Sequence, residues 1–401
     1  MYSVLSRGTI ACATAIAALV LAGAALAAPA PKQLTLVGSL HEHSAYSDGW
    51  PGSRPYDYYV SGRNHGLDFM GGSDHSDTLG VPISASSYCL DESDPAAALQ
   101  PGCLLADTVN PADSFRKWDA TEEQAAAASA PGFTAFRGFE WTSDRFGHIN
   151  VYFSSHYRNA KDDGGYVTMA TFYSWLTLPA ALGGGSDGIA TFNHPGDKKL
   201  STSDPGFNWD DFAYVPAADD QMVGIETFNS ASDFGSPGVH SGPPEGWYAR
   251  ALDRGWHVGA VGAEDLGHHI GDDWGGPGQA KTVVLSAGRS PAAIEDAMRA
   301  RHFYAVGGPQ WRLSFSVNGA GMGSRLALGA GSRLTIKSAL TRADGSMLTG
   351  AQLHQPHIAQ MDERFANRRS ADAEFAHQVA FGGQGIANVI GLVDDAGFET
   401  R

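Results

Sequence analysis

The sequence predicts an α/β fold, because short apolar runs rich in β-branched and aromatic residues recur along the chain with loops or helical stretches between them. Histidine and acidic residues stand at the ends of several of these runs. From about residue 310 the pattern changes to alternation of apolar and polar residues, which is typical of a small antiparallel sheet. Together these observations predict a large α/β domain with a small β appendage at its C-terminal side.

The predicted strands of the large domain are residues 34–40, 69–72, 133–139, 149–153, 189–192, 222–228 and 258–261. Between them we expect helices over residues 55–64, 170–182 and 244–254, since each stretch runs into glycine, a frequent helix stop. A last unit is predicted as a helix over residues 290–301 and a strand over residues 302–306.

The domain boundaries follow from the same patterns. Residues 34–306 are predicted to form the α/β domain and residues 310–348 the antiparallel appendage, in which Asn318-Gly319 is a hairpin signal. Residues 352–401 lose the alternation and are predicted to be an irregular tail.

Residues 1–27 are predicted to be a secretory signal peptide. The single charge of Arg7 precedes an apolar run over residues 10–26, which ends in the small-residue site Ala25-Leu26-Ala27. The alternative is an uncleaved membrane anchor, because the run approaches the length that spans a bilayer. Cleavage after Ala27 predicts a periplasmic or secreted protein without a stable membrane anchor.

Two cysteines remain after removal of this segment. Cys89 and Cys103 lie in a Pro- and Ala-rich stretch, and an oxidising compartment favours a disulfide between them over free or metal-binding thiols, because no Cys-x-x-Cys spacing is present. The net charge of -16, about -17 without Arg7, disfavours a nucleic-acid partner. The sequence does not indicate an oligomeric state.

The most informative motif is His41-Glu42-His43, which directly follows the first predicted strand. In an extended chain, residues two apart point the same way, so His41 and His43 can converge on one cation while Glu42 turns aside. Imidazole binds zinc, iron or manganese, and the carboxylate of Asp48 supplies a harder ligand nearby. The motif indicates a metal site if other strand ends supply further ligands.

Other strand ends carry the same residue types. In a barrel of parallel strands the carboxyl ends share one face, so side chains distant in sequence meet there. Such a gathering is hard to explain by packing, because buried charges are costly without partners. The further candidates are Asp74-His75, Glu140, His194 before Pro195, and Asp265.

Several of these residues have competing interpretations. Asp48 in Ser-Asp-Gly is also suited to capping a turn. Asp74 is either a helix cap or, as we expect, an acceptor for an imidazole N–H, with His75 the ligand. Glu140 lies between aromatic residues, where an unpaired carboxylate is costly, and is expected to bridge two ions.

The remaining candidates are also open to more than one reading. His148 opens a strand, and its spacing fits a structural role equally well. Glu226 is predicted to lie within a strand, as a ligand or as a buried hydrogen-bond acceptor. Asp265 competes with its neighbour Glu264, and the imidazole of the same loop is either His268 or His269.

The set of motifs resembles the PHP (polymerase and histidinol phosphatase) family of metallohydrolases, in particular its CehA/McbA branch, which includes carbaryl hydrolase. The final motif departs from the Asp-x-His usual in the family by an extra residue before His268. The resemblance covers most of residues 34–306. The residues that carry it are His41-Glu42-His43 with Ser47-Asp48-Gly49, Gly66-Leu67-Asp68 with Ser73-Asp74-His75, Glu140, His148 and Asn193-His194-Pro195.

The resemblance implies a distorted (β/α)7 barrel of PHP type with two or three divalent ions, zinc, manganese or iron, at its carboxyl rim. It implies a first ion held by His41, His43, Glu140 and Asp265. Glu140 is implied to bridge to a second ion that His148 and His194 complete. Asp48, His75 and His268 are implied to hold a third.

These features predict a secreted metal-dependent hydrolase that uses a metal-activated water on small phosphoesters or on carboxylic or carbamate esters. Asp74 and Glu226 are candidates for orienting ligands or moving protons, and Arg145 for contacting an anionic substrate group. No Gly-x-Ser-x-Gly motif for a serine nucleophile is present in the sequence. The alternative is a non-catalytic metal- or glycan-binding protein on the same barrel.

Overall fold

The computed structural model describes residues 33–50, 52–82, 99, 116–162, 164–197, 207–229, 232–234, 242–269, 271–277, 280–307, 311–326, 333–343, 381–382 and 386–387. The predicted signal peptide, the Cys89 and Cys103 pair and nearly all of the predicted tail lie outside these residues. Within them, no helix combines the length and the apolarity that crossing a membrane requires.

The first sheet contains the opening strand of the domain. Its strand order is β16-β15-β11-β10-β1-β2-β3, with β1, β2 and β3 parallel and β10 antiparallel to both β1 and β11. The strands are β1 (Leu34–Ser39), β2 (Phe69–Gly71), β3 (Thr134–Phe136), β10 (Lys281–Ser286), β11 (Phe303–Val306), β15 (Phe381–Gly382) and β16 (Ile386–Ala387).

The second sheet has the order β4-β5-β6-β7-β8, and β9 also pairs with β7. Strand β5 runs antiparallel to β4 and β6, whereas β6, β7 and β9 are parallel. The strands are β4 (Gly138–Trp141), β5 (Ile149–Tyr152), β6 (Ile189–Phe192), β7 (Met222–Asn229), β8 (Ser232–Asp233) and β9 (Gly259–Ala263).

The two sheets are joined by isolated bridges at the ends where β1, β2 and β9 finish. One bridge pairs His75 with Glu140, and the other pairs Glu42 with Leu266. The predicted α/β class is confirmed as a mixed α/β fold. A closed barrel is not detected among the described strands, because they form separate sheets that only isolated bridges connect. The predicted strand 133–139 is divided into β3 and β4, which belong to different sheets.

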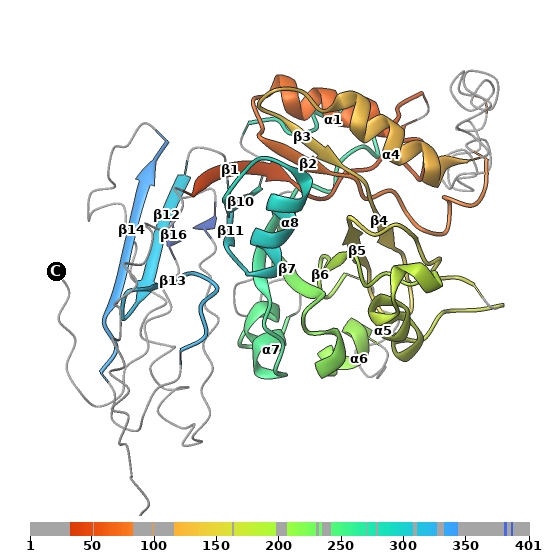
Figure 1. The fold of residues 1–401 in the computed structure, drawn as a ribbon. Helices are drawn as coiled ribbons and strands as arrows, with labels where there is room; N and C mark the ends of the chain where they lie inside the picture. Colours follow the sequence, from red (N-terminus) through yellow and green to blue (C-terminus); the bar gives the residue numbers. More distant parts are fainter. Residues whose placement is uncertain are drawn as a thin grey trace, which may run out of the picture. The chain divides into compact units, whose positions relative to one another are not determined.

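Helices accompany both sheets, and Figure 1 shows α1 and α4 together beside β2 and β3. The predicted helix 55–64 has the predicted bounds, while the predicted helix 170–182 divides where Pro179 ends the α-helical part. The helices are α1 (Pro55–Asn64), α4 (Lys117–Ala128), α5 (Met169–Thr177), α6 (Phe207–Phe212), α7 (Trp247–Asp253) and α8 (Pro291–Arg299), with 3-10 turns η3 (Ala180–Leu182) and η4 (Pro216–Ala218).

Local signals explain where helix α8 begins. Ser290 caps α8 by accepting a hydrogen bond from the Ala293 N–H at 3.2 Å, and Pro291 occupies the first helical position, where its missing N–H is not needed. Helix α7 starts only after Gly246, later than predicted. Helix α4 and strand β10 were not predicted, although the alanines of α4 favour a helix strongly.

The predicted antiparallel appendage is confirmed as a three-stranded sheet of β13 (Ala320–Gly321), β12 (Trp311–Val317) and β14 (Ile336–Arg342), in that order. Alternation buries Leu313 and Phe315 and exposes Ser314 between them. Leu313 and Phe315 share a hydrophobic cluster with Tyr304 and Val306 of β11, so one face of the appendage packs against the large domain.

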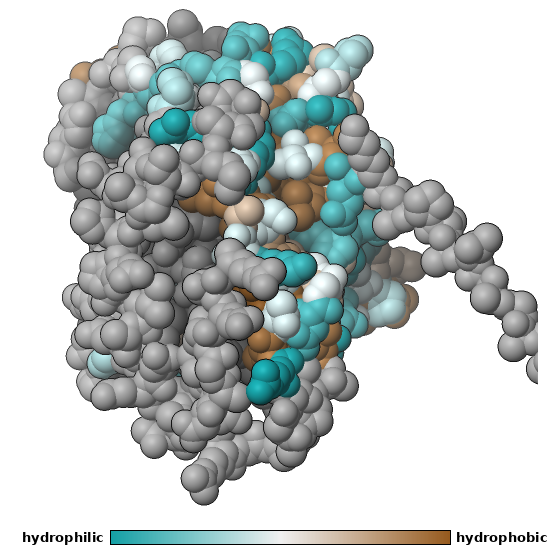
Figure 2. Space-filling model, turned by 90° about the vertical axis from the view of Figure 1, so that its left-hand side faces the viewer, coloured by the Kyte–Doolittle hydropathy of each residue, from teal (hydrophilic) through white to brown (hydrophobic). Residues whose placement is uncertain are grey.

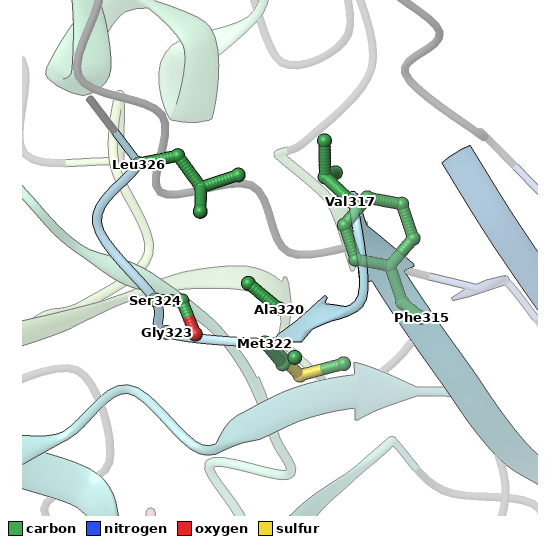
Figure 3. Close-up of a pocket in the computed structure, with 8 residues that line it drawn as sticks. Phe315, Val317, Ala320, Met322, Gly323, Ser324 and Leu326 are labelled. Atoms are coloured by element: carbon green, nitrogen blue, oxygen red, sulfur yellow. The ribbon is translucent and has the colours of Figure 1, made fainter. Parts of the chain in front are cut away.

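The appendage also contains a small hollow that Phe315, Val317, Met322 and Leu326 line with apolar atoms (Figure 3). None of the residues that line it is a predicted metal ligand. Figure 2, viewed from the appendage side, shows hydrophobic and hydrophilic residues intermixed over the described part of this face. Among the described residues of the appendage, none belongs to a group that could hold a metal ion.

Candidate metal centre

The structure brings all nine predicted ligand residues together at the joined ends of the two sheets. They form four overlapping groups, and within each group one ligand atom per residue lies within 4.8 Å of the others. The groups are His41, His194 and Asp265; His41, His43 and Glu140; His75, Glu140 and His148; and His43, Asp48, His75 and His268.

Strand direction explains this convergence. His41 and His43 follow β1, His194 follows β6 and Asp265 follows β9, so these side chains reach the carboxyl ends of their strands. His148 precedes β5 instead. Because β5 is antiparallel to β4 and β6, its amino end lies at the same edge of the sheet. The reversed strand thus supplies a ligand from its start.

Glu140 is the carboxylate that belongs to two of the groups, and its side chain is fully buried. Its Oε1 lies 3.2 Å from His41 Nε2 and 3.1 Å from His148 Nδ1, and its Oε2 lies 2.6 Å from His75 Nδ1. Burial opposes ionisation, yet the surrounding imidazoles, His148 and His41 foremost, hold the pKa of Glu140 well below its ordinary value. Each carboxylate oxygen therefore faces a different part of the cluster, as a bridging ligand requires.

Asp265 closes the cluster on the side of β9. Its Oδ1 lies 3.0 Å from His43 Nε2 and 3.4 Å from His41 Nε2. The backbone of Asp265 has a φ of 53°, and its N–H donates to the His41 carbonyl at 2.8 Å. This left-handed conformation is uncommon for a residue other than glycine, but aspartate tolerates it better than most. The neighbouring Glu264 turns away and contacts Lys281.

Asp48 organises the third part of the cluster. Its Oδ2 lies 3.1 Å from His75 Nε2 and 3.4 Å from His268 Nε2. Burial raises the pKa of Asp48, but the nearby imidazoles of His75 and His268 outweigh it and hold that pKa well below its ordinary value. The Asp48 carboxylate is therefore suited to contact a cation.

The structure distinguishes the two histidines of the last loop. His268 joins the group with Asp48, whereas the side chain of His269 is 86% exposed and lies near Asp272. Gly267 makes this turn possible, with a φ of 116°. A Cβ at that position would lie 1.9 Å from the His43 carbonyl oxygen. The extra residue of the loop is thus accommodated by a glycine that turns His268 inward.

Unsatisfied polar atoms show that the cluster is incomplete as protein alone. Buried polar atoms in folded proteins are normally hydrogen-bonded. Among the described residues, several ligand atoms are buried without a hydrogen-bond partner. They are His41 Nε2, His43 Nε2, Asp48 Oδ1, Glu140 Oε2, His148 Nδ1 and Nε2, and His194 Nδ1. Imidazole and carboxylate donors gathered in this way fit divalent metal ions.

Glu226 and Asp74 occupy different positions from each other. Glu226 Oε1 lies 2.6 Å from His41 Nδ1, behind the ring, and its Oε2 accepts the His194 N–H at 2.7 Å. Asp74 accepts hydrogen bonds from Ser44 and Ser47 and, within the described part of the chain, from no imidazole, contrary to our expectation. Glu226 therefore fixes the orientation of a ligand, whereas Asp74 holds the turn that leads to Asp48.

A cation that was not predicted, Lys161, lies beside the cluster through Asp144. Lys161 Nζ lies 2.7 Å from Asp77 Oδ2 and 3.1 Å from Asp144 Oδ2, and Asp144 Oδ1 lies 3.8 Å from His148 Nε2. Arg145 places its guanidinium over the Phe146 ring at 5.5 Å. Lys161 lies in a segment between predicted elements and had no motif to single it out.

Two buried amides were also missed from the sequence. Asn193 Nδ2 donates to Glu140 Oε1 at 2.8 Å, and Asn229 Nδ2 contacts two carboxylates of the centre. Asn193 precedes His194 in a motif, which was a usable signal. Asn229 had none, because asparagine at a strand end more often marks a turn.

The fold and the cluster together define an α/β protein with buried histidine and carboxylate groups that suit a multinuclear metal site. No protein family model matches the chain, and no curated protein matches it. Solved structures similar to it include PHP-like metal-dependent phosphoesterases and an endonuclease Q.

A two-domain protein from Bacteroides vulgatus, containing a predicted PHP-like metal-dependent phosphoesterase, is 19% identical over 78% of this chain and 86% of its own, with a TM-score of 0.42. A putative metal-dependent phosphoesterase from Bifidobacterium adolescentis is 13% identical over 59% of this chain and 91% of its own, with a TM-score of 0.28. The lesion-specific endonuclease PfuEndoQ from Pyrococcus furiosus is 10% identical over 85% of this chain and 80% of its own, with a TM-score of 0.35. With TM-scores this low, these likenesses bear on neither substrate nor mechanism.

Proposed function

We propose that the protein is a metal-dependent phosphoesterase-like hydrolase. The observation that supports it is the sharing of the buried Glu140 between groups that otherwise use different histidines. A carboxylate shared in this way is suited to bridging two ions, and bridged ions are typical of enzymes that hydrolyse phosphate esters.

We further propose the PHP family, its CehA/McbA branch and a distorted PHP-type (β/α)7 barrel. The sequence motifs support the family. The two isolated bridges, which connect β2 to β4 and β1 to β9 near their ends, support the barrel because they lie where a closed ring of strands would need them.

In the proposed centre, His41, His43, Glu140 and Asp265 would hold one ion. Glu140, His148 and His194 would hold a second, and Asp48, His75 and His268 a third. Divalent ions at such a site lower the pKa of bound water and polarise the scissile phosphoryl or carbonyl oxygen. Glu226 keeps the His41 ring in place, and Lys161 holds Asp144 beside His148.

The compartment belongs to the same proposal. A cleaved segment over residues 1–27 would send the mature protein to the periplasm or the exterior, and a Cys89 to Cys103 disulfide would suit that environment. A small-molecule ester is the expected substrate. A mass measurement of the secreted protein, with and without reductant, tests both the cleavage site and the disulfide.

The function is tested with purified mature protein whose metal content is measured. We expect turnover of a nitrophenyl phosphodiester or a phosphomonoester that chelator and His41→Ala both abolish, while His269→Ala retains it. Turnover of a naphthyl carbamate alone would move the substrate to the carbamate class. Bound metal without turnover of any of the three would favour a metal- or glycan-binding protein. Full activity after chelation would refute the metal mechanism.

A further inference from the structure

Strand β7 contains a bulge beside the centre. Glu226 pairs with Val261 of β9 and Phe228 pairs with the very next residue, Gly262, so β7 has one extra residue at Thr227. The Thr227 carbonyl accepts a hydrogen bond from the Phe234 N–H at 2.9 Å. Bulges of this kind change the direction of the side chains that follow, and they are frequent next to active sites.

The bulge changes which residues of β7 face the centre. In a regular strand, residues three apart such as Glu226 and Asn229 point to opposite faces. Here the Asn229 side chain lies against Glu226, with its Nδ2 3.0 Å from Glu226 Oε2. The extra residue therefore turns Asn229 to the face that carries the metal ligands.

The same amide nitrogen reaches Asp265. Asn229 Nδ2 lies 3.1 Å from Asp265 Oδ2, and the Asn229 residue is only 7% exposed. An amide NH2 group has two hydrogens, enough for one hydrogen bond to each carboxylate. The amide therefore bridges the two carboxylates and holds both side chains in place.

The two carboxylate oxygens of Asp265 have different partners. Oδ2 is held by Asn229, and Oδ1 is the atom that faces His43 and His41. On the other side, Glu226 Oε2 accepts a hydrogen bond from the Asn229 amide, and Glu226 Oε1 contacts His41 Nδ1. One neutral side chain thus links an expected ligand to the carboxylate that orients another ligand.

We propose that Asn229 is a positioning residue of the metal centre, which fixes the rotamer of Asp265 and couples it to the pair of Glu226 and His41. The inference rests on the proposed metal-binding function. It assigns Asn229 no contact with substrate. Its effect is expected in the affinity and geometry of the metal site.

The experiment is a titration of metal-free protein with Co²⁺, in which the visible absorption of the bound ion measures binding. Thermal unfolding of each metal-free variant is measured separately, to show that the variant folds. Asn229→Ala removes the amide, and Asn229→Leu removes it while keeping a similar volume. Asn150→Ala is the matched control, since the buried Asn150 amide donates to the Leu40 carbonyl at 3.2 Å and, among the described residues, to no carboxylate.

Loss of a residue that orients ligands typically weakens metal binding roughly 10- to 100-fold. We expect that loss, with an altered Co²⁺ spectrum, in both Asn229 variants, and wild-type affinity and spectrum in Asn150→Ala. If the wild type binds no Co²⁺, the proposed function fails. If the wild type binds it and the Asn229 variants bind it equally well, the positioning role is refuted.

Two further results would also overturn the positioning role. One is a loss of affinity in Asn150→Ala equal to that of the Asn229 variants, because any buried amide would then have the same effect. The other is failure of both Asn229 variants to fold while Asn150→Ala folds, which would make Asn229 a residue of the folding core only.

Discussion

Strands β7 and β9 carry carboxylate and imidazole groups at both of their ends, and the two ends are built differently. At the amino ends, Asp219 Oδ2 lies 2.6 Å from His257 Nδ1, and Asp219 Oδ1 accepts the His257 N–H at 3.2 Å. Arg301 donates to the carbonyls of Asp219 and Met222. At the carboxyl ends, several atoms of the candidate metal ligands are buried without hydrogen-bond partners among the described residues.

The difference separates a structural cluster from a functional one. A buried ionic group whose hydrogen bonds are satisfied contributes to the fold and requires nothing from outside. A buried group left unsatisfied costs free energy, which a bound ion can offset. The same residue types in the same strands therefore have opposite roles, and substitutions at the two ends should have separable effects.

The largest effect is expected at the carboxyl ends. Glu140→Gln removes the shared anion and keeps the side-chain size, so we expect hydrolysis to fall by on the order of a thousandfold or more, because both neighbouring ions lose a charged ligand. Measured kcat with metal content determined in parallel checks it. Retention of wild-type metal content and rate would show that Glu140 bridges nothing.

The next effect is expected at the amino ends. Asp219→Ala removes the carboxylate that contacts the His257 ring, and removal of one member of a buried ionic pair costs about 3 kcal/mol. Urea denaturation of metal-free protein measures this loss in the free energy of unfolding. Metal affinity should not change. A matching loss of metal affinity would mean that the two ends are coupled and not separable.

A smaller effect distinguishes two adjacent histidines at the carboxyl ends. His268→Ala removes one of the expected ligands of a partly exposed site, and we expect metal binding at that site to weaken roughly tenfold. His269→Ala is the control, because its side chain is 86% exposed and it belongs to none of the ligand groups. Equal results for the two variants would contradict the assignment of His268.

The smallest expected effect is on the pH dependence of the free energy of unfolding, to which Asp219 contributes. Burial raises the pKa of Asp219, but the hydrogen bonds from His257 outweigh it, and the folded-state pKa lies below the ordinary value. A carboxyl whose pKa is depressed by folding stabilises the protein above its unfolded-state pKa, and the contribution disappears as the pH falls through the folded-state pKa.

Comparison of the wild type with Asp219→Asn tests this sign. The difference in unfolding free energy should be on the order of 1 kcal/mol near neutral pH and should shrink in acid. Denaturation at a series of pH values provides the measurement. A difference that grows in acid would reverse the assignment.

Local patterns were sufficient for part of the molecule. The bounds of α1 followed from its flanking proline and glycine, and the alternation of β12 gave the appendage, because these signals act over a few residues. The division of the predicted strand 133–139 and the antiparallel course of β5 were not predicted, since a short apolar run has no mark of the direction in which it pairs.

The sequence by itself determined the chemical identity of the centre, because the histidines and acids at strand ends are the residues that the structure brings together. Only the tertiary structure decided how they are arranged. The reversal of β5 brought in His148, the turn at Gly267 selected His268, and the bulge in β7 aimed Asn229 at Asp265. The reason is physical: residue type fixes what a side chain can bind, but pairing direction, register and a single inserted residue decide which side chains meet.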